Sequence, residues 1–113
     1  MTPDEFVSGL KAQCRDAAVA DCIANFKSPP GRKPAQSLVE LSQWFNALAE
    51  RDREMLVRAL TEVAETTLFG VLAVLDGARA IEEQGEKSVF HLSVVKNGIV
   101  SAICPGPHDL HDL

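Results

Sequence analysis

The sequence predicts an α+β domain in which three helices precede a small antiparallel β-hairpin that packs on them. Two observations carry this prediction. Apolar residues recur at helical spacing through most of residues 3–75, whereas the last third is rich in β-branched residues on either side of Asn97-Gly98. Asn-Gly between two such runs is the strongest short signal for a two-residue hairpin turn. A chain of 113 residues fits a single domain, 1–113.

The first helix begins at a capping box. Thr2 is the expected N-cap, Glu5 stands three residues later, and Pro3 occupies the first helical position, where its missing N–H is not needed. The helix is predicted to end near Lys27. Its apolar residues form two stripes, namely Phe6, Leu10, Cys14 and Ala17 in one and Val19, Cys22, Ile23 and Phe26 in the other. Either the helix bends near Ala18 or its second half faces a different surface, in the same domain or in a second subunit.

Two further helices follow a loop at residues 28–35, where three prolines and a glycine exclude regular structure. Helical spacing predicts the second helix over residues 36–49 and a long third helix over residues 52–75. Residues 68–75 are apolar all round, which is typical of a buried helix, although eight such residues could also form a buried strand. We favour a helix because the pattern continues in phase from Leu56. Gly77, after Asp76, is expected to end it.

The hairpin is predicted from strands at residues 88–95 and 99–104. A two-residue turn pairs Lys96 with Ile99 and, further along, His91 with Cys104. An isolated hairpin is marginally stable, so it must pack on the helices or gain a strand from residues 78–82. The face assigned to the helices consists of Phe90, Leu92, Val94, Ile99 and Ile103. The last residues, 104–113, are expected to form a turn and then one turn of helix.

Composition narrows the class of protein. The net charge is −5 and the basic residues are scattered, so a nucleic acid is not expected as the main ligand. No apolar run approaches the roughly 20 residues of a membrane span, and the first residues do not resemble a signal peptide. Three cysteines without a CxxC pattern are not a disulfide framework. We therefore expect a cytoplasmic protein with no membrane partner.

The only pattern that suggests a metal site lies near the end of the sequence. His108 and His111 have the spacing that puts two imidazoles on one side of a helical turn, where they could hold zinc or nickel. His91 and Cys104 are the only further ligands nearby in sequence, so a four-ligand site is conceivable. The alternative is a solvated segment with adventitious metal affinity.

Catalytic motifs are absent, and we expect neither an enzyme nor a cofactor. Cys14 and Cys22 are read as small core residues. The alternative function is a small metal-dependent or thiol enzyme that uses the residues of the conceivable metal site.

A partner surface is suggested by two kinds of residue. Trp44 and Phe45 are adjacent on a helix and point about 100° apart, so one can enter the core while the other anchors a partner. Burial of both is the alternative. The acids Glu54, Glu62 and Glu65 could offer a negative helix face to a basic protein, or could simply form a solvated face.

Residues 75–77 read Leu-Asp-Gly and residues 110–113 read Leu-His-Asp-Leu. Because of these two motifs, residues 55–113 resemble small bacterial proteins of unassigned role that carry LDG near the middle and end in an LHDL(F) tail. Some of them are suspected immunity proteins of contact-dependent or polymorphic toxin systems. The resemblance implies a bacterial source and a binding role, and it transfers no catalytic residue. We expect an interaction or inhibitor module with a protein partner, and a homodimer through the first helix would explain Val19, Ile23 and Phe26.

Overall fold

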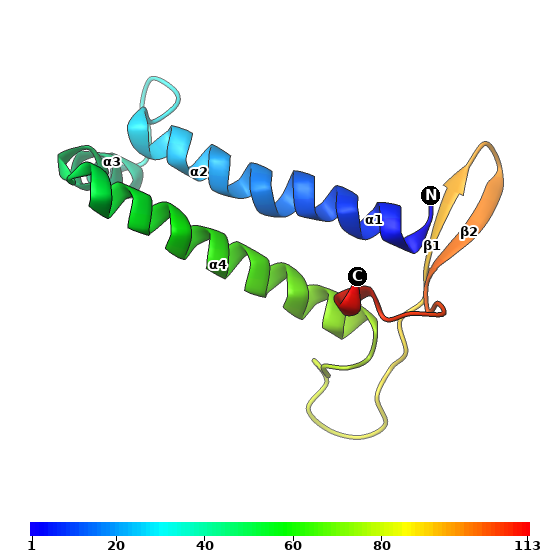
Figure 1. Ribbon diagram of the computed structural model, residues 1–113. Helices are drawn as coiled ribbons and strands as arrows, with labels where there is room; N and C mark the ends of the chain where they lie inside the picture. The colour runs from blue at the N-terminus through cyan, green and yellow to red at the C-terminus, as the bar shows by residue number, and fades with distance from the viewer.

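The computed structural model describes all residues 1–113 and confirms the α+β architecture of three helices followed by a two-stranded antiparallel sheet (Figure 1). A π-helical segment, Lys11–Asp16, joins the first two helical elements into one continuous helix. The elements are α1 (Pro3–Leu10), α2 (Ala17–Lys27), α3 (Gln36–Ala47), α4 (Glu50–Leu75), β1 (Leu92–Lys96) and β2 (Ile99–Cys104). A short 3-10 turn, Leu110–Asp112, follows them.

The π-helical segment explains why the first helix carries two apolar stripes. In a strict α-helix, residues four apart drift by about 40° around the axis. The wider π turns offset this drift. Residues spaced four apart therefore stay on the inner face, all of them buried or half-buried: Val7, Lys11, Arg15, Val19 and Ile23. Cys14 and Cys22 lie on the exposed side as a result, so the expectation that both are core residues is wrong.

The two halves of this helix contact different parts of the same domain. The α1 half packs against β2 and the C-terminal 3-10 turn, whereas α2 packs against α3 and α4. At the α3 end, the Phe26 ring lies 5.9 Å from the Phe45 ring between centroids. Apart from the exposed Cys22, the second apolar stripe is thus half-buried within the chain, and a dimer through the first helix is not needed to explain Val19, Ile23 and Phe26.

Helix α4 runs back past the first helix and remains helical through residues 68–75, as expected. Two backbone hydrogen bonds close it in a Schellman motif. The N–H of Ala78 donates to Ala73 O at 2.9 Å, and the N–H of Gly77 donates to Val74 O at 3.1 Å. Gly77 has a φ of 78°, which favours glycine. None of the helices, α4 included, combines the length and apolar character that crossing a bilayer requires.

Burial of residues 68–75 on all sides was expected, and this expectation is wrong. Leu72 and Ala73 are buried against the core, but Val71 is 51% exposed and Phe69 47% exposed on other sides of the helix. The reason is that the chain supplies packing elements to only one side of α4.

The hairpin turn is as predicted, with Asn97 at φ 53°, Gly98 at φ 77° and Lys96 paired with Ile99. A β-bulge at Ile103 then shifts the register, so Cys104 pairs with Leu92 and not with His91. The bulge turns both Ile103 and Cys104 inward, where they are 1% and 3% exposed. Of the face assigned to the helices, Ile99 is 69% exposed because the hairpin tip extends past them (Figure 1).

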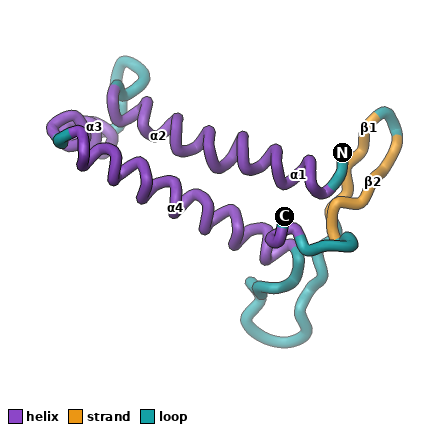
Figure 2. Tube along the Cα trace, viewed as in Figure 1, coloured by secondary structure: helices purple, strands orange, loops and turns teal.

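The predicted third strand at residues 78–82 does not form, and a long loop connects α4 to β1 (Figure 2). Glu82 organises this loop by accepting hydrogen bonds from Ser88, at 2.7 Å from its N–H and 2.9 Å from its hydroxyl. The hairpin packs on α1 and gains its support there.

The chain is elongated and thinly packed. Its main core joins α1, α4, β2 and the C-terminal turn through Val7, Leu72, Ile103, Cys104 and Leu110. Only 9 of 113 residues are buried, and the radius of gyration is 18.4 Å, against about 13 Å for a globular domain of this length. The accessible surface is 8148 Å², against about 6,100 Å² for a monomer of 12.2 kDa. The chain alone therefore leaves much more surface uncovered than a typical monomer.

Candidate functional site

The Asp76 carboxylate accepts more hydrogen bonds than any other side chain in the molecule. Its side chain is only 4% exposed and accepts three hydrogen bonds from the C-terminal segment. The backbone N–H groups of Leu110 and His111 donate to its two oxygens at 2.8 Å each, and His111 Nδ1 lies 2.6 Å from Oδ2. The contact joins the end of α4 to a segment about 35 residues further along the chain.

The local structure explains why an aspartate serves here. Asp76 is the C-cap of α4, so its side chain projects from the end of a rigid helix. Leu110 and His111 begin the 3-10 turn, and the first N–H groups of any helical turn lack partners within the turn. The Asp76 carboxylate satisfies two of them, as an N-cap side chain would, although it is distant in sequence. The Leu-Asp-Gly and Leu-His-Asp-Leu segments are therefore held together by this contact.

The Asp76–His111 contact shifts the pKa values of both side chains. Burial opposes ionisation of Asp76, but the hydrogen bonds from Leu110 and His111 outweigh it, and the pKa of Asp76 lies below its usual value. The hydrogen bond to Asp76, assisted by the nearby carboxylates of Asp112 and Asp109, raises the pKa of His111 above 6.5. The pair is therefore an ion pair at mildly acidic pH.

The raised His111 pKa predicts a pH-dependent stability. The protonated His111 ring adds to the free energy of unfolding. This contribution is complete below the ordinary histidine pKa of 6.5 and is lost as pH rises through the higher pKa of the folded state. We expect urea unfolding to show a smaller decline in stability from about pH 5.5 to about pH 8.5 for His111→Gln than for the unmodified chain. His91→Gln, the same change at an exposed histidine, is the control and should leave the decline unchanged. An identical decline in the His111→Gln variant would contradict the ion pair.

A small pocket of about 140 Å³ lies beside His111. Phe69 forms one wall, its ring edge-on to the imidazole with 5.4 Å between centroids. The charged residues that line it are Lys11, Arg15, Glu65 and Asp112, and no Ser, Thr or Cys side chain does. An Asp–His pair can act as a general base, but here it has no adjacent hydroxyl or thiol to activate. The hydrogen bonds to Asp76 accordingly stabilise the C-terminal turn, and the side chains that line the pocket include no hydroxyl or thiol nucleophile.

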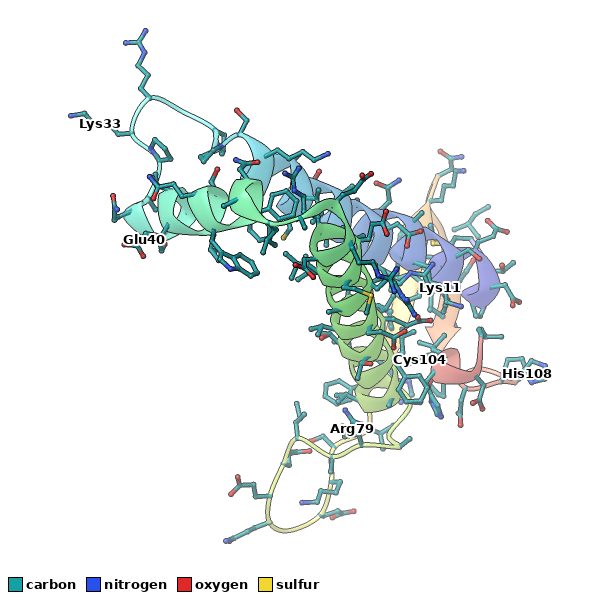
Figure 3. All side chains as sticks on the ribbon, turned by 60° about the vertical axis from the view of Figure 1, so that its left-hand side comes forward. Lys11, Lys33, Glu40, Arg79, Cys104 and His108 are labelled. Carbon is teal, nitrogen blue, oxygen red and sulfur yellow. The ribbon has the colours of Figure 1, made fainter.

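The four residues of the conceivable metal site do not meet. Cys104 is buried, and its Sγ lies 3.4 Å from Leu75 O and 3.5 Å from Phe90 O. His91 and His108 are exposed, and Figure 3 shows His108 projecting to the side, away from Cys104. The β-bulge is the physical reason that Cys104 no longer faces His91.

A different group of three, Asp109, His111 and Asp112, has ligand atoms within 4.8 Å of one another. Its histidine is already engaged, because Nδ1 contacts Asp76 and Nε2 lies 3.7 Å from Asp112 Oδ1. A metal ion must displace the proton that these carboxylates favour. The geometry thus supports an ion-paired histidine better than a ligand.

The sequence did not predict the Asp76–His111 pair. Asp76 stood there only as the residue before the helix-ending Gly77, and His111 as a conceivable metal ligand. The only sequence signal for the pair was that the Leu-Asp-Gly motif contains Asp76 and the Leu-His-Asp-Leu motif contains His111.

The suggested partner residues are divided between core and surface. Trp44 is 51% exposed, whereas Phe45 is 1% exposed and belongs to the interior, so Phe45 is withdrawn from the partner surface. The acids are spread along α4. Glu54 lies 3.7 Å from Arg51, Glu65 lies 3.6 Å from Arg15, and Glu62 lines a groove nearer the middle of the helix.

Comparison of the chain with protein-family models, with curated proteins and with solved structures yields no match.

Proposed function

We propose that this chain is a non-enzymatic protein-interaction module of the inhibitor or immunity kind, which binds a protein partner through α3. The observation that carries the proposal is the exposure of Trp44 on a helix that is firmly anchored by its neighbour Phe45. Tryptophan is among the residues that contribute most to binding energy at protein interfaces, and a rigid support reduces the entropy lost on binding.

The surroundings of Trp44 suit an interface. Leu41, three residues earlier, lies on the same side of α3 and is 44% exposed. Glu40 also lies one turn before Trp44 and is exposed, and Figure 3 shows it near the start of α3, close to the loop that carries Lys33. An apolar anchor with an acidic neighbour, on a chain of net charge −5, favours a partner with a basic surface. The resemblance to suspected immunity proteins agrees with a partner of this kind.

The interaction face is held in place by contacts at the C-terminal end of α3. Arg53 from α4 donates from Nε to Leu48 O at 3.1 Å and from Nη2 to Asn46 O at 3.2 Å, which fixes the end of α3. Asn46 in turn donates to Lys27 O at 3.2 Å, which links α3 to the end of α2. Removing Trp44 should therefore not disturb the fold.

The test is a calorimetric titration of the chain with candidate basic nuclease domains. We expect Trp44→Ala to weaken the complex about 30-fold, which is the loss typical of an interface hot spot, while the free energy of unfolding changes by less than about 1 kcal/mol. Because Trp44 is the only tryptophan, burial at the interface should also shift the chain's fluorescence to shorter wavelength against a tryptophan-free partner.

Phe90→Ala provides the matched control, since Phe90 is an exposed aromatic residue on the distant loop. This variant should bind like the unmodified chain. Absence of any complex with basic nuclease domains, or equal binding by Trp44→Ala, would refute the proposed function.

A further inference from the structure

The side of α4 that faces away from the core carries a shallow open groove of about 560 Å³. Its apolar residues are Val63, Val71 and Val74, and the small residues Thr66, Thr67 and Gly70 lie between Val63 and Val71. Val63 is 64% exposed and Val71 is 51% exposed. These residues recur every three to four positions, so they form one continuous stripe along the helix.

We propose that this groove binds the same groove of a second copy of the chain, with the two α4 helices antiparallel about a two-fold axis near Thr66. The proposal is separate from the partner surface on α3. It rests on three observations. One side of α4 is uncovered, the chain as a whole exposes an unusually large surface, and Glu62 and Arg79 place opposite charges in the groove.

The chain leaves more surface open than a monomer of its mass normally does. The accessible area of 8148 Å² exceeds that of a typical monomer of this mass by about 2,000 Å². A standard protein interface covers about 800 Å² of each partner. The chain therefore has enough uncovered surface for a dimer interface in addition to the α3 face, and the groove lies on the side of α4 that no other element covers.

The charges that line the groove suit another copy of the chain. In a two-fold interface, residue i of one subunit contacts residue j of the other, and j contacts i. A groove that pairs with itself must therefore carry complementary groups on either side of its centre. The α4 groove carries one acid, Glu62, and one base, Arg79, and neither forms an ion pair within the chain.

The positions of these charges fit an antiparallel pair. Arg79 follows α4 but folds back over it: its Nη1 would lie 2.8 Å from a Cβ atom added to Gly70, so the guanidinium rests on that glycine. Figure 3 shows Arg79 at the end of α4 where the long loop leaves the helix. Glu62 lies eight residues before Gly70, about 12 Å along the axis. A two-fold axis midway between them, near Thr66, brings each Glu62 to the Arg79 guanidinium of the other copy.

The small residues at the centre support close approach of the helices. Interaxial distance depends on the side chains at the contact, and Thr66 and Thr67, the small residues nearest the proposed axis, permit a short one. A basic partner would be expected to meet an acidic surface. This groove instead presents one charge of each sign, which favours a second copy.

Light scattering and sedimentation measured at about 0.1 mM chain provide the test. We expect the unmodified chain to have twice the mass of the 12.2 kDa monomer. The single variants Glu62→Arg and Arg79→Glu should each weaken the dimer about tenfold or more, because the two-fold places two like-charge contacts in every dimer. The double variant, in which the charges are exchanged, should restore it.

Glu54→Arg is the matched control, since it makes the same change on the same helix outside the groove, and the dimer should persist. A monomeric unmodified chain would overturn the proposal and leave the groove to a different protein. A dimer that tolerates both single reversals and Val71→Asp would place the interface elsewhere and overturn it as well. Failure of the double variant to restore a dimer lost in the single variants would overturn the antiparallel arrangement, provided that circular dichroism shows the fold intact.

Discussion

Replacing Phe45 with alanine should lower the free energy of unfolding by about 3–4 kcal/mol, the loss typical of truncating a buried phenylalanine. The ring is 1% exposed and lies at the point where α2, α3 and α4 meet. It packs against Phe26 at 5.9 Å between centroids, and the Arg53 guanidinium lies 5.6 Å from its centre. The substitution opens a cavity and removes a cation–π contact at once.

Urea unfolding followed by circular dichroism measures this effect, with Phe90→Ala as the control. Phe90 undergoes the same change of side chain on a loop, where it is 36% exposed, and should lose much less stability than Phe45. Because the chain has few buried residues, Phe45→Ala should also loosen α3 as a unit and increase hydrogen exchange there. A loss below about 1 kcal/mol for Phe45→Ala would show that α3 does not depend on this contact.

The contrast between Phe45 and its neighbour illustrates what the sequence can predict. Helical spacing alone showed that Trp44 and Phe45 point in different directions, but it did not show which one enters the core. That choice depends on Phe26 and Arg53, which come from other helices. The orientation of a helix about its axis is a tertiary property, and the local pattern restricts it without determining it.

Signals that act within a few residues were predicted well. The hydrogen bond from the Glu5 N–H to Thr2 Oγ1, the glycine at the end of α4 and the Asn97-Gly98 turn all appear where expected. Each depends on the φ angle or hydrogen-bonding groups of adjacent residues, so neighbours in sequence suffice to identify it.

Features that depend on distant packing were not predicted. The change of stripe correctly suggested that the second half of the first helix faces a different surface of the domain, but it did not identify the π-helical segment that links the two halves. The bulge at Ile103 likewise arises where β2 meets the core, and two adjacent apolar residues, Ile103 and Cys104, were its only sequence signal. Once the bulge is present, the register that would have placed Cys104 opposite His91 cannot form.

The site at Asp76 shows the same limit at its largest sequence separation. Nothing near Asp76 in the sequence indicates that its partners lie at Leu110 and His111. A turn residue and a helix-anchoring residue look alike until the chain returns to them. The importance of Asp76 therefore has to be tested in the folded protein.

Asp76→Ala should lower the free energy of unfolding by about 2–3 kcal/mol, because it leaves two N–H groups of the C-terminal turn without acceptors in a buried setting. Leu110, which is 1% exposed, depends on that turn for its place in the core. The loss should appear in urea unfolding, and the C-terminal residues should become susceptible to carboxypeptidase.

Asp76→Asn separates the two roles of the carboxylate. The amide oxygen keeps one acceptor for the turn but cannot form an ion pair with His111, so this variant should be intermediate in stability and should lose the His111-dependent change with pH. Asp109→Ala, the control, removes an exposed carboxylate in the same segment and should cost less than about 0.5 kcal/mol. If Asp76→Ala were as stable as Asp109→Ala, the C-terminal turn would be held by the packing of Leu110 alone, and Asp76 would be no more than the last residue of α4.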